Sequence, residues 1–212
     1  MLKKIGTNAF ANCSSLTDMI LPDGLEVLND FALKGCPQLG VDYLPESITT
    51  IGADVFYENA NMLDDVVLPN LTGHLGGGAF AKTNIKRVLD LGNITGTGVS
   101  SVYWPTNNGA GTFAGCVELE LLVLPPSLTS IQHALAAGCT ALKAVVVKAT
   151  TPPTLGNDCF LNTNNCHIYV PDASVTAYRE ASGWSRYASM IKPLSQLATD
   201  NPSLYEEISE YL

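Results

Sequence analysis

The 212-residue chain is 46% hydrophobic, which is enough apolar sequence to bury a substantial core in one domain or two small ones. Its 11 Lys and Arg residues against 20 Asp and Glu residues leave a net charge of −9. This charge repels phosphate backbones and anionic lipids, so nucleic acid is not an expected partner. No apolar run reaches the roughly 18 residues that a membrane-spanning helix needs, so membrane insertion is not expected either.

The N-terminal segment MLKKIGTNAF passes from basic residues directly into polar sequence, without the apolar stretch of a signal peptide. We therefore expect either a cytosolic chain or one from which an export signal has been removed. Six cysteines are too few for a disulfide-dense scaffold.

The sequence repeats with a period of about 23 residues. The segment CSSLTDMILPDGLEVL at 13–28 returns as CVELELLVLPPSLTSI at 116–131, and each is followed by another cysteine at the repeat interval. Periods of this length are typical of solenoids, in which each repeat forms one coil and stacked coils share a core. The spacing predicts about seven coils between residues 5 and 171, each with an inward anchor residue: Phe10, Leu33, Phe56, Phe80, Phe113, Ala136 and Phe160.

Each coil is predicted to contain one short strand just before a position usually held by proline. Such strands are stable only when they pair with the strand of the next coil, so stacking predicts a parallel sheet on one face of the solenoid. Turns and short helical pieces are expected on the return path. Asp42 occupies an inward position, which predicts a local shift. The expected strands span 19–21, 41–44, 66–68, 87–89, 121–124, 144–147 and 167–170.

Alternation along these strands predicts a row of side chains that point outward from the sheet. The row is apolar, and Asp18 and Asp65 stand beside it. Either strand propensity alone or a protein-binding face would produce such a row. We call it the outward row and treat it as a candidate binding surface: Ile20, Tyr43, Val67, Val123, Val146 and Tyr169.

Four cysteines recur at the repeat interval and are predicted to fill one small apolar packing position: Cys13, Cys36, Cys116 and Cys139. No CxxC pair and no histidine at ligand spacing accompanies them, so no metal site is expected. Cys159 and Cys166 lie outside this position and are either free or bridged to each other.

Catalytic constellations are weak. His74, His133 and His167 fall in different coils with unlike surroundings. The glycine cluster HLGGGAF at 74–80 lies on a turn without the following Lys of a phosphate-binding loop. The sequence predicts neither an enzyme nor a cofactor.

The repeat is interrupted at 91–112, where the spacing exceeds the period by about 12 residues. The segment LGNITGTGVSSVYWPTNNGAG at 91–111 is rich in Gly and Asn, with Tyr103 and Trp104 near its middle. Glycine flanks around aromatic residues predict either a projecting binding loop or a loop that folds back on the array.

After the array at 1–171, a helical cap and tail are predicted at 172–212. Asp172 is expected to be the N-cap of a helix with Tyr178 on its inner face, and a second helical piece follows Gly183. These pieces would cover the sheet edge and interior of the last coil, with Trp184 packed in the cap. The acidic end at 201–212 is either a last amphipathic helix or mobile.

No matching cap precedes Ile5. The chain is therefore expected either to belong to a longer protein or to pair its open front end with another molecule, for example as a dimer.

The segments IGTNAFANCSSLTDMILPDGL and IGADVFYENANMLDDVVLPNL resemble the BspA-like, or treponemal-type, leucine-rich repeat family. The resemblance covers about residues 5–171, and the segment 168–194 is similar to the ending of such arrays in Bacteroidetes surface proteins. It implies an α/β fold: a right-handed leucine-rich repeat solenoid with a C-terminal helical cap and no catalytic residues.

The same resemblance implies a secreted or cell-surface module for adhesion or protein binding. The expected ligand is a protein, another host-matrix component or a glycan, held by the outward row or by Tyr103 and Trp104. A purely structural spacer that positions another domain is the alternative.

Overall fold

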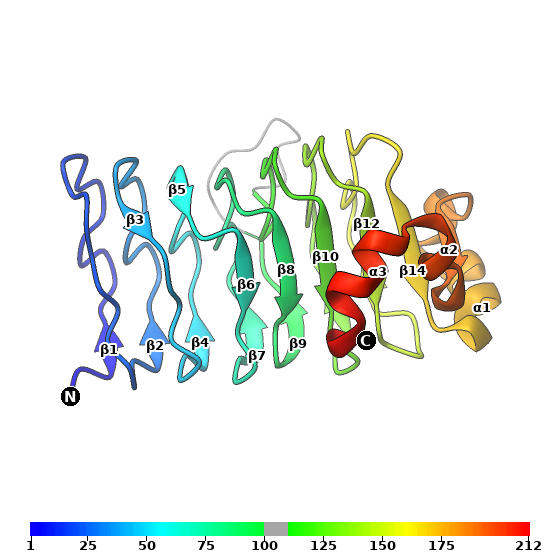
Figure 1. Cartoon of the computed structure of the whole chain (residues 1–212), viewed down its shortest axis with the longest axis horizontal. Helices are drawn as coiled ribbons and strands as arrows, with labels where there is room; N and C mark the ends of the chain where they lie inside the picture. The colour runs from blue at the N-terminus through cyan, green and yellow to red at the C-terminus, as the bar shows by residue number, and fades with distance from the viewer. Residues whose placement is uncertain (100–109) are drawn as a thin grey trace.

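A computed structural model describes residues 1–99 and 110–212 as a solenoid of stacked coils. The N-terminus lies at one end of the stack and the helices lie at the other (Figure 1). Residues that pair between neighbouring coils are 23 positions apart over most of the array, as with Lys4 and Val27 or Leu121 and Ala144. The predicted period and the predicted solenoid are confirmed.

The parallel sheet before the proline position forms the front of the solenoid, and we call it the front sheet. The last five predicted strands are confirmed, and a strand from the cap pairs with the last of them to give a six-stranded sheet. Two shorter strands precede them as a separate pair. The strands are β3 (Gly40–Val41), β5 (Asn61–Met62), β6 (Asp65–Val67), β8 (Arg87–Asp90), β10 (Leu121–Leu124), β12 (Ala144–Val147), β14 (His167–Val170) and β15 (Ile191–Pro193).

The first two predicted strands are largely wrong. Residues 19–21 form no strand, and an isolated bridge joins Asp18 to Gly40. The second strand ends at Val41, which is buried in the main core, while Asp42 is exposed. Burying an unpaired carboxylate is costly, so Asp42 points to solvent and strand pairing ends at Val41. This is the local shift that Asp42 predicted.

The return path contains the expected turns, but it has short strands in place of the expected helical pieces. It carries a second set of short parallel strands, and within the described part of the array no helix precedes Asp172. Exposed and buried residues alternate in them, as with Thr50 and Ile51, which favours extended backbone. The strands are β1 (Lys4–Ile5), β2 (Val27–Leu28), β4 (Thr50–Ile51), β7 (Thr72–Leu75), β9 (Asn93–Thr97), β11 (Ser130–Ile131) and β13 (Thr154–Leu155).

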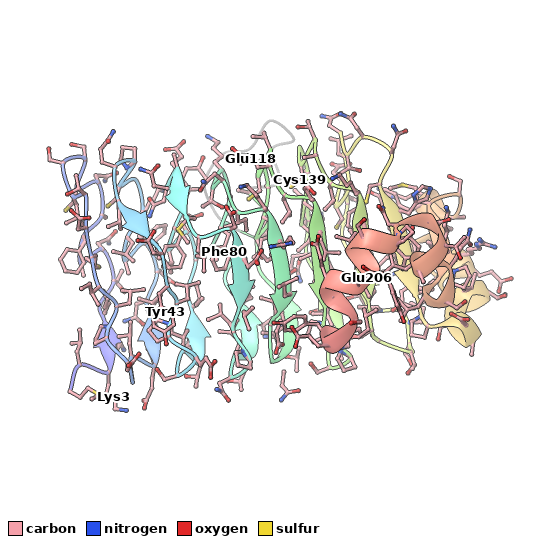
Figure 2. The ribbon with its side chains drawn as sticks, viewed as in Figure 1. Lys3, Tyr43, Phe80, Glu118, Cys139 and Glu206 are labelled. Atoms are coloured by element: carbon pink, nitrogen blue, oxygen red, sulfur yellow. The ribbon has the colours of Figure 1, made fainter. Side chains whose placement is uncertain are left out.

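The core between the two ladders is built from the anchor residues. The rings of Phe56, Phe80 and Phe113 stack in succession, with centroids 5.3 and 5.7 Å apart. Phe80 is shown inside the solenoid in Figure 2. These three anchors therefore pack on one another from coil to coil, which is how a single coil gains a core that it cannot form alone. The prediction of an inward anchor is wrong for Phe10 in the first coil, whose side chain is 37% exposed.

Most of the cysteines are buried in the same core. The packing prediction is confirmed for Cys36, Cys116 and Cys139, whereas Cys13 in the first coil is exposed, contrary to expectation. Cys159 and Cys166 are also buried, and both thiols are free, so the bridged alternative is absent from this structure.

The insertion is narrower than the predicted 91–112. Strand β9 pairs with β7 and β11, and Val99 forms an antiparallel bridge with Gly111. Residues 91–99 therefore belong to a regular coil. Tyr103 and Trp104 lie outside the described residues.

The predicted cap is present after the last coil. It contains η1 (Asp172–Ser174), α1 (Val175–Glu180) and η2 (Ser185–Tyr187), followed by β15. Tyr178 and Trp184 are fully buried, and each donates a hydrogen bond of 2.7 Å, to the carbonyls of Ala149 and Pro153. Their packing role is confirmed.

Asp172 is not the N-cap that the sequence predicted. It lies inside η1, and its carboxylate accepts a 3.0 Å hydrogen bond from the backbone N–H of Ser195. This bond holds the pKa of Asp172 below its usual value and ties the cap to the chain that follows β15.

The C-terminal tail, residues 194–212, turns back along the solenoid. It contains η3 (Leu194–Gln196), α2 (Leu197–Asp200), α3 (Pro202–Ile208) and η4 (Ser209–Tyr211). Helix α3 crosses in front of β10 and β12 (Figure 1). Of the two alternatives for the acidic end, the amphipathic helix is the one observed.

Candidate binding face

The outward row is divided into an exposed half and a covered half. Ile20 is 93% exposed and Tyr43 is 51% exposed. Val67 lies at the boundary, because it is partly buried and packs against the covered cluster. Val123 is 3% exposed, while Val146 and Tyr169 are fully buried. The alternation predicted correctly that these three side chains lie outside the main core, but the expectation that they face solvent is wrong.

The C-terminal tail covers the second half of the row. Leu197, Leu204 and Ile208 are buried residues of the tail. They form an apolar cluster, separate from the main core, with residues of the front sheet: Leu89, Leu121, Val123, Ala144, Val146 and Tyr169. Burying a side chain of this size stabilises a protein by about 1.5–3 kcal/mol, so the tail and the sheet protect each other from water.

Asp200 fixes the start of the tail. Its carboxylate accepts a 3.0 Å hydrogen bond from the hydroxyl of Tyr169 and pairs with the ammonium group of Lys192 at 2.6 Å. The Lys192 contact lowers the pKa of Asp200, and Tyr169 contributes in the same direction. Burial, followed by the adjacent Asp200 carboxylate, raises the pKa of Tyr169 well above its usual value. The phenol therefore remains a hydrogen-bond donor at neutral pH.

Two further contacts hold the end of the tail. The guanidinium of Arg87 on β8 binds Asp65 through two nitrogens, at 2.6 and 2.7 Å, and also contacts Glu207 of α3. Lys148 donates a 2.6 Å hydrogen bond to the backbone carbonyl of Tyr211. The carboxylates, Asp65 foremost, raise the pKa of Arg87, so this cation is charged at any working pH.

The tail also forms one wall of a hollow with the covered sheet. Leu89, Val123 and Lys148 line the hollow on the sheet side, and Tyr211 and Leu212 line it on the tail side. Because this hollow lies at the seam between tail and sheet, it exists only while the tail is docked.

The exposed half of the row carries two hollows, one on each side of Tyr43. The first lies between Ile20 and Tyr43. The second lies between Tyr43 and Val67. Tyr43 lies among the N-terminal coils in Figure 2, far along the solenoid from Glu206 of α3. The tail therefore leaves this half of the face open.

Sequence reasoning missed the docking of the tail, although its signal is present. The spacing of Leu197, Leu204 and Ile208 predicts one apolar side, and an amphipathic helix must bury that side against something. The apolar outward row is the matching surface. What the sequence did not indicate was that the two surfaces belong together.

Across residues 1–99 and 110–212, no group of three or more His, Cys, Asp and Glu side chains is arranged to hold a metal ion. His133 accepts a 3.0 Å hydrogen bond from the backbone N–H of Asn157, which gives it a structural partner. No helix in the described ranges is long and apolar enough to cross a bilayer.

The stacked coils, with leucine and its equivalents at recurring inward positions, define a leucine-rich repeat solenoid. The chain belongs to the BspA type leucine rich repeat family, whose model matches residues 1–102 and 106–186 in six copies. The match extends beyond the predicted array boundary at 171 into the cap.

Two solved structures match the chain, and the first of them is similar in fold. A leucine-rich repeat protein from Bacteroides ovatus is 22% identical, with a TM-score of 0.57 over 82% of this chain and 44% of its own. A leucine rich cell surface protein from Faecalibacterium prausnitzii is 16% identical, with a TM-score of 0.28 over 89% of this chain and 72% of its own. The chain thus spans less than half the length of the Bacteroides ovatus protein. No curated protein matches it.

Proposed function

We propose that the protein is a noncatalytic recognition module that binds another macromolecule through the exposed half of its outward row. The observation that supports this most is the exposure of Ile20 at 93% and Tyr43 at 51% on a row whose other half is covered by an amphipathic helix. Contiguous exposed apolar side chains on an otherwise folded surface are typical of interaction sites.

We extend the proposal to adhesion on the outside of the cell, as a secreted or surface-attached protein. Membership of the BspA type repeat family supports this placement. Protease treatment of intact cells tests it: digestion of the protein while the cells stay sealed supports an exterior location, and full protection opposes it.

A structural spacer is the second candidate, and one observation favours it. The tail already covers Val123, Val146 and Tyr169, so the chain has used half of the row to complete its own fold. A spacer would bind nothing through Ile20 and Tyr43.

Binding to an array of extracellular-matrix proteins and glycans separates the two candidates. The variant Ile20→Glu with Tyr43→Glu places charge on the exposed half of the row. Val117→Glu with Leu161→Glu is the matched control, since Val117 and Leu161 are also exposed apolar residues but lie outside the row. Recognition predicts that a ligand of the wild-type chain is lost in the first variant and kept in the second.

The same assay can contradict the proposal. A wild-type chain that binds nothing on the array supports the spacer. A ligand retained by the Ile20→Glu and Tyr43→Glu variant places recognition elsewhere. Circular dichroism of both variants confirms that each is folded.

A further inference from the structure

The sign of the charges changes along the front face. In the covered half, the sheet supplies cations to the tail: Arg87 contacts Glu207, Lys192 contacts Asp200, and Lys148 holds the carbonyl of Tyr211. The tail matches them, because it has four acidic residues and no Lys or Arg: Asp200, Glu206, Glu207 and Glu210. An acidic amphipathic segment is therefore what the covered half accepts.

The exposed half carries the opposite charge. Asp18 and Asp42 line the hollow between Ile20 and Tyr43, and Asp42 and Glu46 line the next hollow. Asp23 accepts a 3.3 Å hydrogen bond from the hydroxyl of Tyr43. In the part of the chain that the structure describes, none of these four carboxylates forms an ion pair. Asp65 also lines the second hollow, but it is paired with Arg87. These four carboxylates can therefore form ion pairs with cationic side chains of a partner.

The shape of this half suits side chains from a helix. Tyr43 separates two hollows, and Ile20 and Val67 lie at their outer ends. Three positions on successive coils span roughly 10 Å, because strands of neighbouring coils lie ~4.8 Å apart. Seven residues of an α-helix rise ~10.5 Å, so side chains at i, i+4 and i+7 can follow the row. The tail shows that helices with this kind of apolar side pack on this row.

A second copy of the tail does not fit the exposed half. Its acidic residues would meet Asp18, Asp23, Asp42 and Glu46. In the covered half, by contrast, Asp200 and Glu207 meet cations. Like charges brought together at an interface oppose association. The segment that binds the exposed half must therefore be positively charged where the tail is negatively charged, and it must have an apolar side like that of the tail.

We propose that the exposed half of the outward row binds a cationic amphipathic helix of a partner protein, with its apolar side on Ile20, Tyr43 and Val67 and its Lys or Arg side chains on the surrounding carboxylates. This inference rests on the proposed recognition function and specifies the chemistry of the partner. The partner helix would cover the exposed half of the outward row, next to the half that the tail covers.

A charge-reversed copy of the tail is the probe. It is a labelled synthetic peptide of residues 194–212 carrying Asp200→Lys, Glu206→Lys, Glu207→Lys and Glu210→Lys. The native tail peptide and a scrambled peptide of the reversed composition are the controls. Fluorescence anisotropy against the full chain should show saturable binding of the reversed peptide, and binding of the scrambled peptide should be at least about tenfold weaker because it lacks an apolar side.

Variants of the chain then locate the site. Two double variants should each lower the affinity for the charge-reversed peptide by about tenfold or more. The first is Asp18→Lys with Asp42→Lys, and the second is Ile20→Ser with Tyr43→Ser. The control Val117→Ser with Leu161→Ser should change the affinity by less than about twofold. Added salt should weaken binding, because the pairs with the carboxylates are at the surface.

Three results would overturn the inference: no saturable binding of the reversed peptide, equal binding of the scrambled peptide, or an affinity that is unchanged in the variant Ile20→Ser with Tyr43→Ser. None of them decides the recognition function, which the matrix and glycan array tests independently. If the array yields a ligand that depends on Ile20 and Tyr43 while the peptide fails, recognition stands and the partner chemistry is wrong.

Discussion

The recurring cysteine position is a hydrogen-bonding position as well as a packing position. Cys36, Cys116 and Cys139 each donate from the thiol to the backbone carbonyl of the anchor one coil before, at 2.9–3.1 Å. In the intervening coils the same position holds Asn59 and Thr83, which are buried and hydrogen-bonded to backbone groups. The sequence predicted a small residue here, but the need for a donor or acceptor became clear from the carbonyls that face it.

Burial should make the thiols unequal in reactivity. Of the six cysteines, Cys13 alone is exposed, and burial raises the pKa of Cys159 to about 11 and that of Cys166 to about 12. Because the thiolate is the nucleophile, iodoacetamide should modify Cys13 alone in the native protein and all six cysteines in guanidinium chloride. Peptide mass spectrometry reads the result, and rapid native labelling of Cys139 would contradict the packing described here.

Asp200 should make the tail sensitive to acid. Its folded-state pKa is lowered, so its contribution to stability is complete above the unfolded value of about 3.9 and is lost as the pH falls through the folded value. Thermal unfolding of the wild type and of Asp200→Asn should therefore differ at pH 7 and converge below about pH 3. A gap that stays constant to low pH would show that Asp200 acts without its charge.

At the scale of the coil, one glycine marks how closely neighbouring coils approach. A Cβ at Gly76 would overlap the backbone carbonyl of Gly52, one coil away, whereas a Cβ at the equivalent Gly6 would meet nothing within 4 Å. Gly76→Ala should therefore destabilise the protein by about 1–3 kcal/mol, and Gly6→Ala should change little. Urea unfolding of the two variants measures this. Equal stability would mean that the coils are less tightly stacked at Gly76.

The tail is the second element whose contacts can be tested. Ile208 is fully buried under α3, while Tyr205 on the same helix is 37% exposed. Ile208→Ser should weaken docking by about 2–4 kcal/mol, and Tyr205→Ser should leave it intact. Endoproteinase Glu-C, which cuts after Glu206, Glu207 and Glu210, should remove the tail of the first variant faster. Equal cleavage would place the tail away from the sheet.

The sequence predicted some elements and not others for physical reasons. The strands of the front sheet from β6 to β14 contain short apolar runs just before the proline position, and these runs predicted them. Most of the return-path strands are only two residues long, and the longer β7 and β9 are interrupted by glycine, so neither alternation nor a branched run marks them. At Asp42 the sequence indicated a shift, and the structure shows that the shift shortens the strand there.

At the scale of the whole molecule, the fold was predictable because every coil repeats its neighbour's contacts. The division of the front face was not, because it depends on contacts between distant segments. Arg87 and Glu207 are 120 residues apart in the chain, and no repeat position predicts their meeting. Alternation tells which side of a strand a residue lies on, but not what covers that side.

Hydroxyl-radical footprinting along the outward row tests the central claim of a divided face most directly. Mass spectrometry of the oxidised full chain gives the protection of each residue of the row in one experiment. We predict strong oxidation of Ile20 and Tyr43, and protection of Val123, Val146 and Tyr169 beneath the tail. Oxidation of Tyr169 as rapid as that of Tyr43 would contradict the account.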